Sequence, residues 1–146
     1  MKNLSYICFI AAFITAGSVF GQCRSFVKKN CGDAMAEYVP AENFSAAKLF
    51  PGDVAEVKMT FYGGEDYRLL ICSPPILGEL VFQISDTEGN LLFDNAEHEM
   101  ANHFDFQPAG TQDFIVKVVV PSENSSAIDP QGCVAIISGK KMEASN

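Results

Sequence analysis

Residues 107–118 read QPAGTQDFIVKV, where turn residues lead directly into an apolar stretch. The pattern continues to residue 120, and one side of the stretch carries only apolar side chains: Phe114, Val116, Val118 and Val120. A repeat of two residues is typical of a β-strand with one buried face. The stretch therefore predicts a strand over residues 113–120, entered from a turn that contains Pro and Gly.

Working outward, six other stretches show strand patterns and are bounded by turn residues. They are residues 54–62, 67–73, 79–85, 90–95, 103–107 and 133–138. About seven short strands with regularly spaced turns predict an all-β fold, an antiparallel β-sandwich of jelly-roll or Ig-like type.

Two of the turns make more specific predictions. DTEGN at 86–90 predicts a tight hairpin turn, with Gly89 suited to a positive φ. GGED at 63–66 predicts a second hairpin, between the strands at 54–62 and 67–73. In the first of these strands, Val57, Met59 and Phe61 are expected to face inward.

The segment from 22 to 39 has a different period. Its apolar residues recur at helical spacing: Val27, Cys31, Ala34, Met35 and Tyr38. Pro40 ends any helix there. We expect a short N-terminal helical segment, of one or two turns, packed against the β-sandwich.

Residues 1–21 have the features of a secretory signal peptide. Lys2 precedes an apolar run from 6 to 16, and small residues lie before a predicted cleavage site at Gln22. Residues 22–146 then form one domain, with no apolar segment long enough to span a membrane. The protein is therefore expected to be secreted, periplasmic or on the cell surface.

The cysteines that remain after cleavage support export. Cys23, Cys31, Cys72 and Cys133 are an even number, which predicts two disulfides in an oxidising compartment. If residues 24–38 are helical, Cys23 and Cys31 are about 12 Å apart along the axis, too far to pair. Each then pairs with Cys72 or Cys133. If the segment is a loop, a local Cys23–Cys31 bridge is favoured, with Cys72–Cys133 joining two strands.

The chain is acidic, with a formal charge of −8. Between Glu65 and Asp113 the only basic residue is Arg68. Such a surface repels phosphate backbones, which argues against nucleic acid as a partner. This acidic half is the candidate interaction face, and a basic partner would bind it with strong salt dependence.

Between residues 79 and 121, LVFQIS, the DTEGN turn and LLFDN are followed by FDFQPAGTQDFIVKVVV. This order of motifs resembles that of the pre-peptidase C-terminal domain and related small secreted β-sandwiches. The positions that match the last family motif are Ala109, Gly110, Thr111, Phe114, Val116 and Val118. The resemblance implies a non-catalytic accessory or binding module, in some members assisted by calcium.

Two groups of side chains are candidate binding residues. Asp86, Glu88 and Asn90 have oxygen atoms at alternate positions, as in calcium loops, although the same residues fit a plain hairpin turn. The second group is a set of acidic and imidazole side chains that a folded loop would bring together, for a partner or a metal: Glu97, His98, Glu99, His103 and Asp105.

The sequence offers little for catalysis, because no G-x-S-x-G motif is present and the four cysteines are expected to be oxidised. The prediction is a non-catalytic, exported module that binds a protein or a glycan. The alternatives are a calcium-stabilised structural module, with no other cofactor, and a small secreted hydrolase that uses His98 or His103.

Overall fold

The structure, a computed structural model, describes residues 20–41, 44–124 and 130–143. The predicted signal peptide therefore lies almost entirely outside the described residues. The one α-helix of the described part is α1 (Phe20–Asn30). Its strands are β1 (Tyr38–Pro40), β2 (Ser45–Leu49), β3 (Val54–Phe61), β4 (Tyr67–Cys72), β5 (Val81–Asp86), β6 (Leu91–Asp94), β7 (His103–Phe106), β8 (Gln112–Val119) and β9 (Gly132–Lys141).

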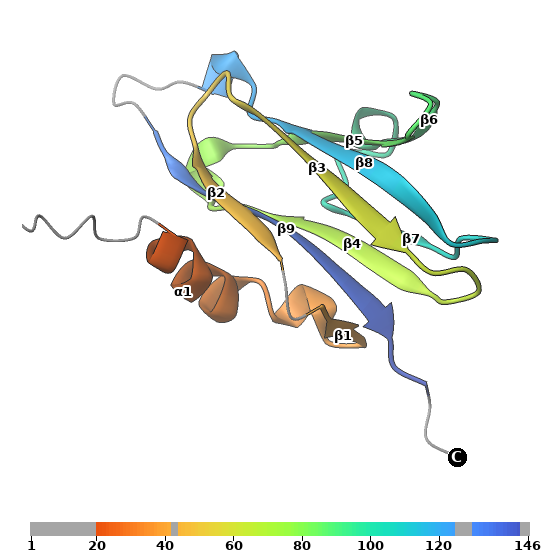
Figure 1. The fold of residues 1–146 in the computed structure, drawn as a ribbon. Helices are drawn as coiled ribbons and strands as arrows, with labels where there is room; N and C mark the ends of the chain where they lie inside the picture. The colour runs from red at the N-terminus through yellow and green to blue at the C-terminus, as the bar shows by residue number, and fades with distance from the viewer. Residues whose placement is uncertain (1–19, 42–43, 125–129, 144–146) are drawn as a thin grey trace, which may run out of the picture.

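The strands form two antiparallel sheets that face each other (Figure 1). The first sheet has the order β1-β9-β4-β7, and β2 also pairs with β9. The second sheet has the order β3-β8-β5-β6. The predicted all-β sandwich with a short N-terminal helix is therefore confirmed, and so are its seven predicted strands.

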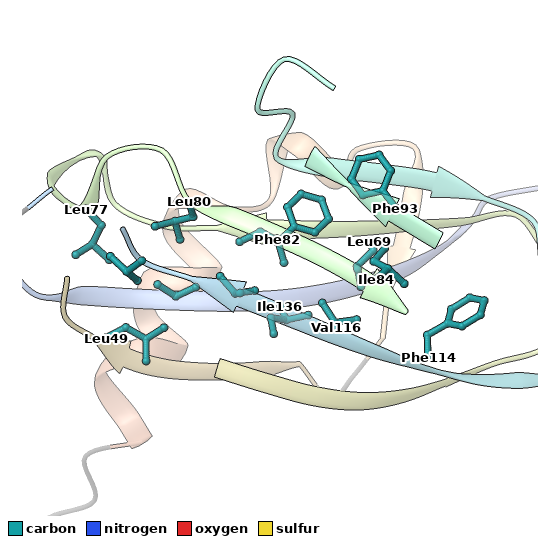
Figure 2. Close-up of a cluster of buried hydrophobic side chains, with 14 of the residues drawn as sticks. Leu49, Leu69, Leu77, Leu80, Phe82, Ile84, Phe93, Phe114, Val116 and Ile136 are labelled. Carbon is teal, nitrogen blue, oxygen red and sulfur yellow. The ribbon is translucent and has the colours of Figure 1, made fainter. Parts of the chain in front are cut away.

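The core lies between the sheets and is built from alternating side chains of both (Figure 2). The strand that the sequence singled out, β8, and the residue that follows it place Phe114, Val116, Val118 and Val120 in this core, all of them buried. In β3 the inward residues are Val57, Met59 and Phe61, as the pattern predicted. Burial of such side chains removes apolar area from water and supplies the main stabilisation of the sandwich.

The predicted hairpin at 86–90 is confirmed, and the one at 63–66 is wrong. β5 pairs with β6 across a turn in which Gly89 has a φ of +90°. β3 and β4, in contrast, lie in different sheets, because β3 pairs with β8 and β4 pairs with β7 and β9. Local turn residues do not distinguish a hairpin from a loop that crosses between layers.

The N-terminal segment covers the outer face of the first sheet (Figure 1). The helix has 11 residues, longer than the expected one or two turns. Val27, Met35 and Tyr38 are buried against side chains of β4 and β9 in a second, smaller core. Ala34 is exposed, contrary to the predicted helical face, because α1 ends at Asn30 and a 3-10 turn at Asp33–Met35 changes the period.

Both disulfides join this segment to the first sheet. Cys23 is bonded to Cys133, with a Cα–Cα distance of 5.3 Å, and Cys31 to Cys72, at 6.0 Å. The helical alternative of the sequence argument is therefore confirmed, and the local Cys23–Cys31 bridge is excluded. The helix is fixed to the sheet near both of its ends.

Candidate functional site

Arg68 organises a polar cluster on the outer face of β4. Its guanidinium donates from Nε and Nη2 to the two carboxylate oxygens of Asp105 on β7, each at 2.7 Å. The Nη1 atom donates to the backbone oxygen of Ala34 at 2.9 Å. The Arg68 Cζ also lies 4.5 Å from the centre of the Tyr38 ring, within the range of a cation–π contact. One side chain thus joins both strands to the N-terminal segment.

The electrostatics of the cluster follow from these contacts. The hydrogen bonds from Arg68 hold the pKa of Asp105 below its usual range, so this carboxylate is charged at neutral pH. Burial, together with the charge of Asp105, raises the pKa of the Tyr38 hydroxyl. Perturbed groups beside a cleft are typical of functional sites, although structural ion pairs produce the same shifts.

A cleft of about 290 Å³ opens beside this cluster. Aromatic rings, two carboxylates, an amide and an ammonium line it: Tyr38, Tyr67, Phe106, Asp66, Asp105, Gln107 and Lys141. The backbone of Lys141 donates to the Asp66 backbone oxygen at 2.8 Å, which fixes one wall. Carboxylates next to aromatic rings suit a cationic side chain of a partner.

Two loops at the same end of the sandwich are locked together. The Gly64 N–H donates to the Pro108 oxygen at 2.8 Å, and the Gln107 side chain donates to the Gly64 oxygen at 3.2 Å. A Cβ at Gly63 would lie only 2.7 Å from the Cα of Gly110, so glycine permits this close approach. The QPAGT turn is therefore one half of a clamped pair of loops, at residues 62–66 and 107–111.

Tyr62 projects from this clamped pair. The residue is 65% exposed, more than any other large apolar residue among those that the structure describes. Its backbone N–H donates to the Tyr67 hydroxyl at 3.3 Å, and Tyr67 in turn packs edge-on against Phe61 in the core. An exposed ring thus stands on a backbone that is tied to the core.

The second predicted set, residues 97–105, is only partly brought together. His103 and Asp105 lie on the same face of β7. His98 instead stacks on Phe93, with ring centres 4.8 Å apart. Glu97 and Glu99 lie on the connection between β6 and β7, where Glu99 has a φ of +54°.

The predicted calcium loop forms a self-contained turn. The Asp86 carboxylate accepts hydrogen bonds from the backbone of Glu88 at 2.9 Å and from the backbone and side chain of Asn90 at 2.8 and 2.7 Å. These bonds, chiefly those from Asn90, lower the pKa of Asp86. Among the described residues, no three His, Cys, Asp or Glu side chains are placed to share a metal ion. Calcium binding at this turn stays a prediction.

The acidic half does not form one face. Asp105 lies on the outer face of the first sheet with Arg68, whereas Asp113 lies on the outer face of the second, 2.8 Å from the Lys58 ammonium. Glu65 is paired with Lys140 at 2.7 Å. The expectation of a single acidic interaction face is therefore wrong, because alternate strands carry these residues to opposite layers.

Sequence reasoning missed Tyr38, Tyr62 and Gly63 as site residues. The one signal for the cluster was the isolation of Arg68 among acidic residues, but its partners come from segments at least 30 residues away. No helix in the described part of the chain has the length and apolar character needed to cross a membrane.

No family model and no curated protein matches this chain. Among solved structures, the fold is similar to that of PliG from Aeromonas hydrophila, described as a periplasmic lysozyme inhibitor of g-type lysozyme. The identity is 8%, the match covers 73% of this chain and 90% of the other, and the TM-score is 0.49. Similarity of this degree does not identify the ligand of the present chain.

Proposed function

We propose that the protein is an exported, non-catalytic module that binds another protein through the loop end of its sandwich. The observation that carries this proposal is the exposed Tyr62 ring on a pair of loops whose backbones are bonded to each other. Binding residues are commonly placed on loops that a rigid scaffold holds in position.

The physical reason is the small entropic cost of such an anchor. Tyr has two side-chain torsions and a large apolar ring, so it contributes contact area while losing little freedom on binding. The clamp between Gly63 and Gly110 and the bond from Tyr62 to Tyr67 remove backbone motion before the partner arrives. Tyr is also enriched among the residues that dominate binding energy at protein interfaces.

The cleft next to these loops indicates the chemistry of the partner. Asp66 provides a carboxylate that forms no salt bridge with the described residues, and the rings of Tyr67 and Phe106 provide aromatic walls. We infer that a Lys or Arg side chain of the partner enters the cleft, while Tyr62 packs against an apolar part of the partner's surface. The net charge of −8 steers a basic protein toward the module, so the association rate falls as salt rises.

A binding role rather than catalysis is supported by the state of the reactive side chains. The four cysteines of the described residues are all in disulfides, and thus offer no thiolate. His98 is stacked on Phe93, and His103 contacts the Asn102 side chain at 3.1 Å. The disulfides also support export, because such bonds persist in oxidising compartments.

Site-specific photo-crosslinking tests the proposal. A photoreactive phenylalanine analogue is placed at position 62, or at position 76 as the control, and each variant is exposed to the native secreted fraction. Ile76 is also exposed, by 61%, but lies at the opposite end of the sandwich. We expect one protein to be enriched at position 62 over position 76. Equal labelling at both positions, or labelling of glycans alone, contradicts the proposal.

Binding measurements with purified proteins then distinguish specific binding through Tyr62 from non-specific adsorption. Tyr62→Ala is expected to lower the affinity for the captured partner by about tenfold or more, whereas Ile76→Ala is expected to leave this affinity unchanged. A purified g-type lysozyme, the target of the similar solved structure, is one of the probes. Binding that Tyr62→Ala leaves intact would show that the loop end is not the interface.

A further inference from the structure

A second pocket lies beneath the N-terminal helix, away from the loop end. It has a volume of about 260 Å³ and lies between α1, the turn that follows it, β9, and the residues Pro40, Ala41 and Phe44. The residues that line it are Arg24, Val27, Lys28, Cys31, Gly32, Met35, Pro40, Ala41, Phe44 and Ile137. Figure 1 shows α1 lying across the sheet that contains β9, which forms one wall of the pocket.

The pocket is apolar inside. Val27, Cys31 and Met35 are buried, and Ile137 of β9 belongs to the same small core. Phe44 packs against that core from the segment between β1 and β2. Burial of a hydrocarbon group against such walls is favourable, because it removes apolar area from water.

The rim of the pocket carries two cations. Arg24 and Lys28 are four residues apart on α1, so they lie on one side of the helix, next to Val27 and Cys31. Both side chains are exposed, and neither has a carboxylate within 4.0 Å among the residues that the structure describes. Unpaired cations at the mouth of an apolar pocket are notable in a chain with 18 acidic and 10 basic residues.

We propose that this pocket binds a free medium-chain fatty acid, with its hydrocarbon chain inside and its carboxylate between Arg24 and Lys28. An apolar wall with cations at the mouth is complementary to a molecule that is apolar at one end and anionic at the other. The volume is below the approximately 300–1,000 Å³ of pockets for drug-sized ligands, which favours one short chain over a two-chain lipid.

The disulfides make the pocket rigid before binding. Cys31, in its wall, is bonded to Cys72, and Cys23 fixes the first turns of α1 to Cys133 of β9. The two bonds therefore fix the position of the helix relative to the sheet on the other side of the pocket. A preformed pocket loses little entropy when its ligand binds.

Titration calorimetry with three ten-carbon probes tests the assignment, each probe below its micelle concentration. We expect saturable, one-to-one binding of decanoate, at least about tenfold weaker binding of decanol, and no binding of decyltrimethylammonium. Equal binding of decanoate and decanol overturns the role of the cations. Absence of saturable decanoate binding overturns the site itself.

Charge-reversal variants localise the ligand. Lys28→Glu is expected to lower the affinity for decanoate by at least about tenfold. Lys29→Glu is the matched control, because Lys29 is exposed on the same helix and does not line the pocket. If the two variants bind decanoate equally, the carboxylate is not held at this rim and the proposal fails.

A pocket-filling variant keeps the test independent of charge. A Cβ at Gly32 meets no atom within 4 Å, and its φ of −66° is ordinary, so Gly32→Leu is expected to fold and to block the pocket. Gly110→Leu, which also has space for a Cβ but lies at the loop end, is expected to bind decanoate normally. Unchanged binding by Gly32→Leu would place the ligand elsewhere. Lys28→Glu, Lys29→Glu and Gly32→Leu leave Tyr62 and the clamped loops unchanged, so this proposal and the protein-binding proposal fail separately.

Discussion

Replacing Arg68 with Met is expected to lower the free energy of unfolding by about 2 kcal/mol. Hydrogen bonds to charged groups contribute about 1.5–3 kcal/mol when they are shielded, and exposed ion pairs about 0–1 kcal/mol. The Arg68 side chain is 22% exposed and that of Asp105 is 42% exposed. We therefore assign about 1 kcal/mol to the paired bonds to Asp105, and about 1 kcal/mol to the Ala34 bond with the Tyr38 contact.

Thermal unfolding followed by circular dichroism measures this loss. For a domain of this size, 1 kcal/mol corresponds to about 4 °C in Tm, so the Arg68→Met variant should melt about 8 °C lower. The Tm of Arg68→Lys should lie between those of the wild type and of Arg68→Met, because an ammonium cannot reproduce the planar guanidinium that donates to both Asp105 oxygens. The stem of Met preserves most of the apolar packing of the arginine.

Lys58→Met is the matched control. Lys58 is also paired with an aspartate, Asp113, at 2.8 Å, but its side chain is 59% exposed on the outer face of the second sheet. Loss of this pair is expected to change Tm little. If Arg68→Met and Lys58→Met have the same Tm, the cluster does not fix the N-terminal segment and the reasoning is wrong.

The same cluster predicts a dependence on pH. The folded pKa of Asp105 lies below its usual value of 3.8, so its ionised form stabilises the fold above that value. This contribution is lost as the pH falls through the lowered pKa. The difference in Tm between the wild type and Asp105→Asn should therefore be largest near neutral pH and shrink below about pH 4. A constant difference across this range would contradict the assignment.

Three further changes test the fold and its turns. Gly63→Ala is expected to lower stability by about 1–3 kcal/mol because its Cβ would clash with the backbone of Gly110, whereas Gly110→Ala has free space and should be nearly neutral in thermal melts. Replacing Cys23 and Cys133 together with Ala opens a link across 110 residues and should cost up to about 5 kcal/mol, measured by denaturant unfolding. Asp86→Asn removes the charged acceptor of the β5–β6 turn and should lower Tm at neutral pH but not in acid. A wild-type melt with calcium or with a chelator tests the calcium hypothesis at the same turn, since a bound ion must raise Tm.

The alternation of apolar and polar residues along the chain predicted most strands of the sandwich. In β3 and β8 the residues expected to face inward do so, because alternation along a strand is a property of the local backbone. The hairpin at Gly89 was predictable for the same reason, since its turn needs a positive φ within the turn itself. The helical period of α1 also excluded a local Cys23–Cys31 bridge once the helix was established.

Tertiary structure decided the features that depend on distant residues. β1 and β2 were not predicted because these short strands are defined by pairing with β9, whose paired residues lie 83 to 103 positions later in the chain. The loop at 63–66 crosses between sheets although its residues suit a hairpin, since strand partners are chosen by burial of whole faces rather than by the turn. Arg68, Tyr38 and Asp105 meet only because three separate segments pack together. Sequence by itself thus determined which side of each strand is apolar. The partner of each strand, and with it the site, was decided by the fold, because burial and charge are satisfied by residues far apart in the chain.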